Sequence, residues 1–463
     1  LLAAFDARLP FTLTQGQSEV AKTIAAEMAA GHPMHRLLQG EVGSGKTVVA
    51  VRAMLTVVDS GGQAALLAPT EVLAAQHYRA ITTLLGPLAE RGKLGAHDEG
   101  TGVTLLTGSM TTAARRQALL DITSGQAGIV IGTHALLEDR VDFFDLGLVV
   151  IDEQHRFGVE QRATLVGKAG SDRRPHVLVM TATPIPRTVA MTAFGALDIS
   201  TLSELPAGRS PITSHVVLSA EKPSHLARVW ERIVEEVRAG HQAYVVVPRI
   251  ASQEDKDLKP GQRQAIALED LAPQLIEGPL AGVRVGIMHG QMPGPDKDEV
   301  MQRFANGPAH KDGIDVLIST TVIEVGVDVA NATTMVIMDA DRFGISQLHQ
   351  LRGRVGRGSA PGLCLLVTEA PAFSPARERL AAVASTNDGF ELAALDLEQR
   401  REGDVLGRNQ SGMRSSLKLV SILRDESILE QARIAAVDIV NKDPDLDSNP
   451  ALARAVQSLI DQA

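Results

Sequence analysis

Short apolar runs alternate with longer stretches of mixed polarity along most of the chain. The runs are rich in Val, Leu and Ile and nearly continuous, which is typical of parallel strands buried on both faces. In the first half, such runs predict strands at residues 37–38, 64–68, 103–107, 128–131, 148–151 and 176–180. In the second half, they predict strands at residues 213–218, 243–247, 283–287, 315–318, 335–338 and 363–367. Helical stretches separate the runs, so both series predict parallel sheets of the α/β class.

Polar segments divide this pattern. Residues 204–211, with the sequence ELPAGRSP, combine two prolines with a glycine and predict a linker between two domains. Residues 251–270 are polar and rich in both charge signs, which predicts an excursion loop within the second domain. We therefore expect α/β domains at residues 1–205 and 206–370, and a third part at residues 371–463.

After residue 367 the pattern becomes helical. Residues 377–384 and 389–399 predict a pair of helices, which is followed by a loop rich in Gly, Arg and Gln at residues 400–412. From residue 421 onward, polar and apolar positions alternate in helical fashion and predict a terminal helix.

Composition narrows the class of protein. The chain has 463 residues, too many for one ordinary core, and its 44% hydrophobic and 22% charged content is typical of a soluble globular protein. The single cysteine, Cys364, rules out an intrachain disulfide and favours a reducing compartment, so we expect a cytoplasmic protein. No apolar run is long enough to predict a membrane span. The net charge of −10 lowers the expectation of nucleic-acid binding without deciding it, because a basic groove can lie on an acidic protein.

The most informative segment is GEVGSGKT at residues 40–47, which fits the phosphate-binding loop pattern G-x-x-x-x-G-K-[ST]. It follows the first predicted strand and precedes a helix predicted over residues 46–58, which is the context that the loop requires. The Lys46 ammonium would bind the β and γ phosphates, and the Thr47 hydroxyl would bind Mg²⁺. The predicted ATP-binding residues of this loop are Gly40, Glu41, Val42, Gly43, Ser44, Gly45, Lys46 and Thr47.

Two carboxylates follow the apolar run at residues 148–151. Asp152 would complete the Mg²⁺ site, and Glu153 would orient or deprotonate the attacking water. The alternative is a solvated strand end, which the phosphate-binding loop makes the weaker interpretation. Together the two segments predict ATP hydrolysis with ATP and Mg²⁺ as cofactors.

Residues near the start of the chain have adenine-binding chemistry. The Phe11 ring could stack on the base, and the Gln17 amide could form two hydrogen bonds with it. Thr14 lies between them, and a helix N-cap is an equally good interpretation of this threonine. Gln17 is the stronger candidate.

A second cluster lies 300 residues further along, in QLHQLRGRVGRG at residues 347–358. Three arginines separated by glycines are unsuited to a buried helix, because each buried charge needs a partner. Arg354 and Arg357 are predicted to reach the γ phosphate from the second domain and to stabilise the charge of the transition state. A surface basic patch is the alternative.

In this order, the segments resemble the motifs of superfamily 2 helicases. The motifs are I at residues 40–47, Ia at 68–77 (APTEVLAAQH), II at 152–155 (DEQH), III at 181–184 (TATP), V at 319–328 (STTVIEVGVD) and VI at 350–357 (QLRGRVGR). The finer match is to the RecG family, in LPF-x-LT at residues 9–14, DEQHRFGV at 152–159 and MTATPIPRT at 180–188. The transcription–repair coupling factor Mfd shares most of these segments, but Ser44 and the Pro69-Thr70-Glu71 segment suit the RecG family better.

The resemblance implies two tandem RecA-like P-loop domains with parallel sheets, followed by a helical hairpin and loop. It implies a monomeric, ATP-driven translocase on double-stranded DNA, binding the duplex arms of replication forks and four-way Holliday junctions in recombination and repair. Gly326 and Asp328 of motif V join the implied ATP site. The family also carries an oligonucleotide-binding wedge domain before its motor. Because Leu1 lies just before the Leu9-Pro10-Phe11 segment, we expect a motor fragment without that domain.

The helical pair and loop resemble the element that couples ATP hydrolysis to movement in this family. Arg379, Arg400 and Gln410 match residues important in it. This loop departs from the family pattern, since residues 401–402 are Arg-Glu where Gly-Pro is usual, and residues 408–409 are Arg-Asn where Thr-Arg is usual. A solvated helix face for Arg379 and an ordinary loop amide for Gln410 stay open as alternatives.

Small polar residues at predicted strand ends suit contacts with DNA phosphates. These are Pro69, Thr70, Thr107, Gly108, Thr133, His289, Gly290, Thr320 and Thr321. Each is weak evidence alone, because Thr and Ser also end strands for turn reasons. Only 3% of the residues are aromatic, which favours tracking of the duplex backbone over stacking on single strands. Three alternative functions stay open: an Mfd-like translocase, a superfamily 2 RNA helicase, and a nucleotide-binding regulatory module without motor activity.

Overall fold

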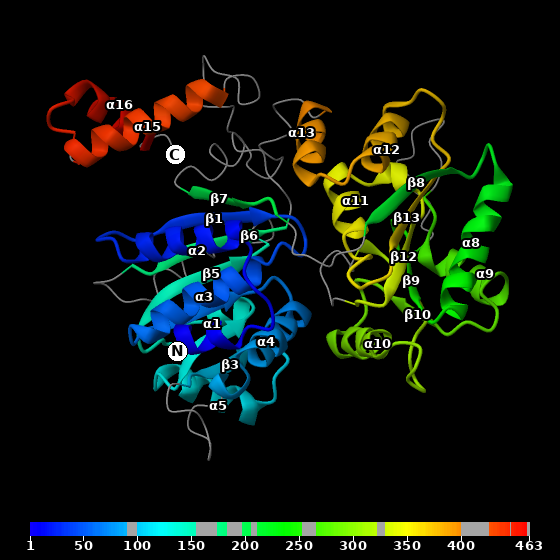
Figure 1. The fold of residues 1–463 in the computed structure, drawn as a ribbon, viewed down its shortest axis with the longest axis horizontal. Helices are drawn as coiled ribbons and strands as arrows, with labels where there is room; N and C mark the ends of the chain where they lie inside the picture. Colours follow the sequence, from blue (N-terminus) through cyan, green and yellow to red (C-terminus); the bar gives the residue numbers. More distant parts are fainter. Residues whose placement is uncertain are drawn as a thin grey trace. The chain divides into compact units, whose positions relative to one another are not determined.

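The computed structural model describes residues 1–89, 100–153, 174–182, 197–204, 211–251, 265–321, 329–399, 426–444 and 446–460 (Figure 1). They fall into two compact units. The first, Leu1–Pro184 with Asp198–Ala393, contains two β-sheets. The second, Ile185–Leu197 with Ala394–Ala463, contains helices α15 (Glu426–Lys442) and α16 (Pro450–Ile460).

The first sheet has seven parallel strands in the order β3-β4-β2-β5-β6-β1-β7. Its strands are β1 (His35–Gly40), β2 (Gln63–Leu67), β3 (Gly102–Leu106), β4 (Ala127–Gly132), β5 (Leu146–Asp152), β6 (His176–Thr181) and β7 (Asp198–Leu202). The six strands predicted in this half are confirmed, but β7 was not predicted. It is an edge strand in which buried and exposed residues alternate, so it lacks the continuous apolar run of the inner strands.

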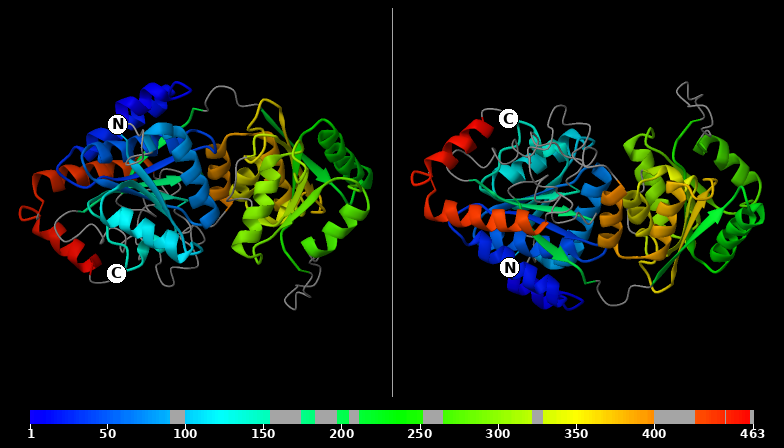
Figure 2. Two further views of the ribbon diagram at one scale, coloured as in Figure 1. Left: turned by 90° about the horizontal axis from the view of Figure 1, so that it is seen from below. Right: turned by 90° about the horizontal axis from the view of Figure 1, so that it is seen from above.

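Helices cover both faces of this sheet, with α3 (Lys46–Asp59) on one side and α5 (Thr112–Thr123) on the other (Figure 2). One core lies between the sheet and three further helices on the α3 side, α1 (Leu2–Arg8), α2 (Gln15–Met28) and α4 (Glu71–Leu85). It contains Phe5, Ile24, Met54 and Ile81, each at most 1% exposed. These helices position the loop between β1 and α3.

The second sheet has six parallel strands in the order β10-β11-β9-β12-β13-β8. The strands are β8 (Ile212–Leu218), β9 (Gln242–Val246), β10 (Val285–Met288), β11 (Val316–Ser319), β12 (Ala332–Ile337) and β13 (Gly362–Thr368). All six were predicted. Its helices are α8 (Pro223–Arg238), α9 (Leu268–Glu277), α10 (Gly294–Asn306) and α11 (Ile345–Arg352), and α8 and α9 share a core with the strands. The α/β prediction is therefore confirmed for both halves.

Two loop predictions need comment. The predicted excursion loop at residues 251–270 ends too late, because α9 begins at Leu268 and buries Leu268, Ala272 and Leu275. Residues 252–264 of this loop, and residues 205–210 of the predicted linker, lie outside the described residues.

The chain after the second sheet is helical, as expected. The predicted pair corresponds to α12 (Pro375–Ser385) and α13 (Gly389–Gln399). The prediction of a single terminal helix is wrong, because α15 and α16 are separate helices. Pro444 follows α15 and Pro450 opens α16, and proline cannot continue a helix that precedes it. Among the helices that the structure describes, none has the length and apolar character needed to cross a lipid bilayer.

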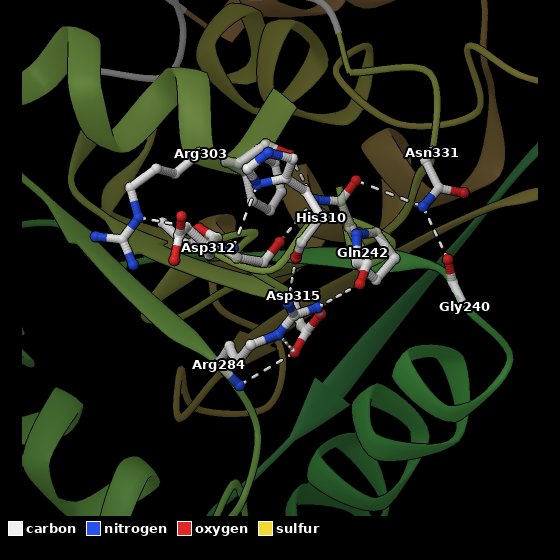
Figure 3. A network of polar contacts seen from close by, with 11 residues as sticks. Gly240, Gln242, Arg284, Arg303, His310, Asp312, Asp315 and Asn331 are labelled. Atoms are coloured by element: carbon white, nitrogen blue, oxygen red, sulfur yellow. Dashed lines mark hydrogen bonds and ion pairs between the residues drawn. The ribbon is translucent and has the colours of Figure 1, made fainter. Parts of the chain in front are cut away.

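Buried polar side chains tie the amino-terminal ends of the strands together. Gln63 donates from Nε2 to the carbonyls of Ile122 and Ala127, and Gln242 donates in the same way to Phe304 and Ile314. The two glutamines occupy equivalent positions, each at the start of a central strand. Figure 3 shows the Gln242 network, in which Asn331 also donates to the carbonyl of Gly240.

Arg284 and Asp315 form the strongest link in this network (Figure 3). The guanidinium donates from Nε and Nη2 to the Asp315 carboxylate at 3.0 and 2.6 Å, and the Arg284 main-chain N donates to it at 3.1 Å. Arg284 also donates to the carbonyls of Pro308 and His310, so the loop before β11 is held against β10.

We predict that Asp315→Ala lowers the free energy of unfolding by about 2–3 kcal/mol, because three donors lose a buried charged acceptor. Urea unfolding would show a lower midpoint at an unchanged slope. Asp312→Ala is the matched control, since Asp312 joins the network through its main chain, and it should change the stability by less than about 0.5 kcal/mol. Equal losses in both variants would contradict this role for the ion pair.

Candidate active site

The loop GEVGSGKT connects the end of β1 with the start of α3. Gly43 and Gly45 have φ angles of 85° and 84°, in the left-handed region that favours glycine. A Cβ atom on Gly45 would also lie 2.3 Å from Gln17 Nε2. The main chain thus turns directly into the N-terminus of α3, where unpaired N–H groups and the helix dipole favour an anion.

Lys46 is the first residue of α3, and its side chain turns back to the loop. Its Nζ donates to the carbonyl oxygens of Gly40 and Glu41 at 2.8 and 2.9 Å. Burial lowers the pKa of Lys46 to about 8, although the carboxylates of Asp152, Glu153 and Glu41 oppose the shift. Phosphate oxygens would take the place of the two carbonyls as acceptors. Thr47 follows in the first turn of α3, as the Mg²⁺ prediction requires.

Asp152 closes β5 beside this loop, and His77 of α4 holds it. The His77 Nε2 lies 2.7 Å from Asp152 Oδ2, and because an ionised carboxylate only accepts, the imidazole donates. Burial alone would raise the pKa of Asp152, but the hydrogen bond and charge of His77 and the charge of Lys46 outweigh it and leave the pKa lowered. Asp152 is therefore an ionised hard ligand, suited to Mg²⁺.

Glu153 has the opposite electrostatic environment. Burial and then the neighbouring Asp152 charge raise the pKa of Glu153 to about 7. Its φ angle of 53° is uncommon for a residue with a side chain, and its main-chain N donates to the Met180 carbonyl of β6 at 3.0 Å. Two adjacent carboxylates with divergent pKa values suit different roles, an ionised metal ligand and a general base near neutral pH.

The arginine cluster of the second sheet faces this site. Gly353, after α11, lies so close that an added Cβ would be 3.4 Å from Val42 Cβ in the phosphate-binding loop. The Arg354 charge lowers the pKa of Glu153, and the Arg357 charge lowers that of Lys46, although neither is the main influence. Arg357 Nε donates to the Gly353 carbonyl at 2.9 Å. The structure thus brings the arginine segment to the phosphate-binding loop, and the contact of Arg354 and Arg357 with the γ phosphate stays a prediction.

The residues considered for adenine binding differ in exposure and in their hydrogen bonds. Phe11 is 47% exposed and open to a ligand. Thr14 is the N-cap of α2 and forms a capping box with Gln17, so the cap interpretation of Thr14 is correct. The Gln17 amide donates to the Ser44 carbonyl at 2.8 Å and therefore also supports the phosphate-binding loop. Its contact with adenine stays a prediction.

Two of the predicted DNA-contacting segments form matching turns at the carboxyl ends of equivalent edge strands. After β3, the Thr107 main-chain N donates to Met110 Sδ at 3.4 Å, and after β10 the His289 main-chain N donates to Met292 Sδ at 3.4 Å. Gly108 and Gly290 are the second residues of these turns. In the second turn the Met292 main-chain N also donates to the His289 carbonyl at 3.2 Å.

The other DNA candidates also lie at strand ends. Thr70 is the N-cap of α4, where its Oγ1 accepts from Leu73 N, and Pro69 precedes it. Thr133 follows β4, and Thr320 and Thr321 follow β11. Arg379 is half-buried, and its Nη2 donates to the Asp341 carbonyl at 3.1 Å. None of these contacts tests DNA binding.

Several predicted residues lie outside the described residues. These are Gly326, Asp328, Arg400 and Gln410. Among the described residues, His77 and His349 were missed. Both lie within segments already quoted for the motifs or the arginine cluster, but no spacing rule links them to a carboxylate in another segment.

We predict that His77→Ala slows hydrolysis by about tenfold to a hundredfold, as loss of a ligand-orienting partner does. Removing the donor raises the pKa of Asp152 and frees its carboxylate to rotate. His77→Gln is the matched control, because its amide nitrogen can take the place of Nε2 and should restore much of the rate. Turnover at saturating ATP and Mg²⁺ tests this, and no loss in His77→Ala would exclude the role.

Three known families match successive parts of the chain. Residues 14–192 match DEAD/DEAH box helicases, residues 225–359 match the helicase conserved C-terminal domain, and residues 386–460 match the C-terminal part of domain 3 of the ATP-dependent DNA helicase RecG. The chain is 56% identical over 453 residues to RecG of Mycobacterium bovis, which covers 98% of this chain and 60% of that protein. It is 44% identical over 442 residues to RecG of Bacillus subtilis, covering 96% and 60%.

The structural comparison agrees. A solved structure of RecG bound to a three-way DNA junction is similar with a TM-score of 0.70 and 38% sequence identity, over 92% of this chain and 52% of that one. The similarity identifies the two sheets as tandem RecA-like helicase domains, as predicted. The chain spans about 60% of the length of these curated relatives. Over that span, sequence, motifs and fold agree, and the chain belongs to the RecG family of superfamily 2 helicases.

Proposed function

We propose that this chain is the motor of an ATP-dependent DNA helicase that translocates on double-stranded DNA at replication forks and Holliday junctions. The observation that carries the proposal is the contact of the arginine segment of the second sheet with the phosphate-binding loop of the first. His349 Nε2 lies 2.7 Å from Glu41 Oε2, and a Cβ added to Gly353 would lie 3.4 Å from Val42 Cβ. Hydrolysis at such a site requires both sheets, so each ATP turnover is linked to their relative movement.

The described residues divide the chemistry among them. Lys46 binds the β and γ phosphates, with the N-terminus of α3 behind them. Glu153 accepts the proton of the attacking water, because its pKa of about 7 lets it ionise near neutral pH. Arg354 and Arg357 stabilise the charge that develops on the transferred phosphoryl group.

The proposed metal is Mg²⁺, held by Asp152 and Thr47. The lowered pKa of Asp152 supports this, since an ionised carboxylate is the ligand that Mg²⁺ prefers. Within the described ranges, no group of three His, Cys, Asp or Glu side chains could hold a metal by protein ligands alone. Mg²⁺ suits such a site, because it usually combines one or two protein ligands with phosphates and water, and it would neutralise phosphate charge when bound.

DNA is the proposed partner, and the names of the relatives support it: they are described as ATP-dependent DNA helicases, and one structure holds a three-way DNA junction. The matching turns at Thr107–Met110 and His289–Met292 place small polar residues at the carboxyl ends of β3 and β10, a position that suits contacts with phosphates. The candidates Pro69, Thr70, Thr133, Thr320 and Thr321 extend this surface, and Arg379, Arg400 and Gln410 couple it to hydrolysis.

The remaining proposals concern organisation. We propose domains at residues 1–205, 206–370 and 371–463, supported by sheets that lie at residues 35–202 and 212–368. We propose a monomer, because one chain supplies both halves of the ATP site, and a cytoplasmic location. The buried Cys364, whose pKa burial raises to about 12, supports a thiol that plays no redox part.

The proposal is tested by the ATPase rate with single-stranded DNA, linear duplex, fork, four-way junction and duplex RNA. We expect duplex-containing DNA to stimulate hydrolysis several-fold and duplex RNA to leave it unchanged. Stimulation by RNA alone would favour an RNA helicase, and hydrolysis that no nucleic acid stimulates would favour a regulatory module.

We predict that Arg357→Ala slows hydrolysis by about 10³-fold or more, as loss of an arginine finger does. AMP-PNP affinity should stay within about twofold, as it should in Arg377→Ala, a control in which the arginine pairs with Glu221 far from the loop. A matched loss of affinity and turnover would indicate a simple binding role for Arg357.

We predict a bell-shaped pH dependence of kcat/KM with its maximum between about 7 and 8. Below about 7 the Glu153 carboxylate is protonated and cannot accept a proton, so the rate falls with decreasing pH. Above about 8 the Lys46 ammonium loses its charge and binds phosphate less well, so the rate falls with increasing pH. The alkaline limb of kcat should lie at higher pH, because bound phosphates stabilise the Lys46 charge. A flat profile from pH 6 to 9 would contradict both assignments.

A further inference from the structure

A run of hydrogen bonds leads from the phosphate-binding loop to the helical hairpin α12–α13. Glu41 is the second residue of the loop, a position that the phosphate-binding pattern leaves open to any residue. Its Oε2 lies 2.7 Å from His349 Nε2 in α11, and its Oε1 accepts a hydrogen bond of 2.6 Å from the Gly389 main-chain N. One carboxylate thus joins the phosphate-binding loop to two segments that lie more than 300 residues further along the chain.

The direction of these bonds is fixed by Arg352, which is 2% exposed. Arg352 Nη2 lies 2.7 Å from His349 Nδ1. A guanidinium has donors only, so Nδ1 must accept and the ring proton must lie on Nε2. His349 is therefore a neutral imidazole that donates to Glu41, and its orientation is set from behind by a buried charge.

The same arginine holds the hairpin. Arg352 Nη1 donates to the carbonyls of Val383 and Thr386 at 2.6 and 2.7 Å, at the end of α12. Gly389 is the first residue of α13, and the Asp388 carboxylate before it accepts from the next two main-chain N–H groups. The end of α12 is thus linked to Glu41 through Arg352 and His349, and the start of α13 is linked to it directly through the Gly389 main-chain N.

A bound phosphate would also change the hydrogen bonds of Glu41. The Glu41 main-chain carbonyl accepts from Lys46 Nζ at 2.9 Å, and phosphate oxygens compete for that ammonium. Binding of phosphate therefore changes the partners of the residue whose side chain holds the hairpin. We propose that Glu41 is a positioning residue that transmits the phosphate occupancy of the loop to α13 through His349 and Gly389. This rests on the proposed function, to which it adds the route from nucleotide to the coupling hairpin.

The test uses a substitution that removes one N–H group. Gly389→Pro deletes the donor to Glu41 at the first position of a helix, where proline is favoured and Asp388 before it is outside the helix. Gly389→Ala keeps the N–H and is the matched control. Hydrogen–deuterium exchange of residues 390–399 is measured in the full chain, with and without AMP-PNP and Mg²⁺.

We expect AMP-PNP to change exchange in α13 by about threefold or more in the wild type and in Gly389→Ala, since local opening responds to single hydrogen bonds. In Gly389→Pro the change should fall below about 1.5-fold, while AMP-PNP affinity stays within about twofold. In a Glu41→Ala background, Gly389→Pro should have no further effect, because the two groups form one contact. A full AMP-PNP response in Gly389→Pro, or additive effects in the double variant, would overturn the proposal.

The same variants separate this proposal from the proposed function. Under the proposal, Gly389→Pro retains DNA-stimulated ATPase but displaces fewer strands per ATP than Gly389→Ala. If the wild type hydrolyses ATP without stimulation by DNA, the proposed function fails, and the exchange experiment still decides whether Glu41 communicates with α13.

Discussion

The parallel direction of the strands is the constraint on which the site depends. Each helical crossover returns the chain to the same edge of its sheet, so the carboxyl ends of β1, β5, β3 and β10 all open on one edge of their sheets. Gly40, Asp152, Thr107 and His289 lie at or just beyond those ends. The opposite edge carries Gln63, Gln242 and the Arg284–Asp315 pair, whose hydrogen bonds stabilise the strand starts. The candidate catalytic residues thereby lie at the carboxyl ends of the strands, and the stabilising hydrogen bonds lie at their amino ends.

Electrostatic interactions then determine which ligand the carboxyl ends of the strands can bind. Lys46 and Glu153 are both buried, and burial shifts their pKa values toward each other, to about 8 and about 7. Arg354 and Arg357 bring two further cations to the same place. These three cations and the N–H groups at the start of α3 favour an anionic ligand. Nucleoside triphosphate meets that requirement, and His77 keeps Asp152 ionised within it.

Much of this could be predicted from the sequence, because the inner strands are nearly continuous apolar runs and the motifs have fixed spacing. The strand β7 could not, since an edge strand with one exposed side has no such run. The start of α9 at Leu268 was hidden by the charged segment before it. His77 and His349 could not be assigned, because each acts on a carboxylate from another segment, and a local pattern carries no information on that pairing. Gln17 was predicted to bind adenine, but its hydrogen bond to the Ser44 carbonyl was not predicted, because that contact also joins two separate segments.

The hydrogen bonds of Lys46 have a consequence for the lifetime of the product complex. The loop supplies its own acceptors for Lys46, the carbonyls of Gly40 and Glu41. When a phosphate departs, the ammonium can therefore donate to these carbonyls again and does not depend on water. The loop carbonyls thus act as an intramolecular competitor of the nucleotide, present at a concentration that dilution cannot lower. Such a competitor weakens the affinity for ADP and ATP alike and shortens the residence time of both. Under the proposed function, a motor that must empty its site once in every step gains speed from this competition, at the cost of tight binding.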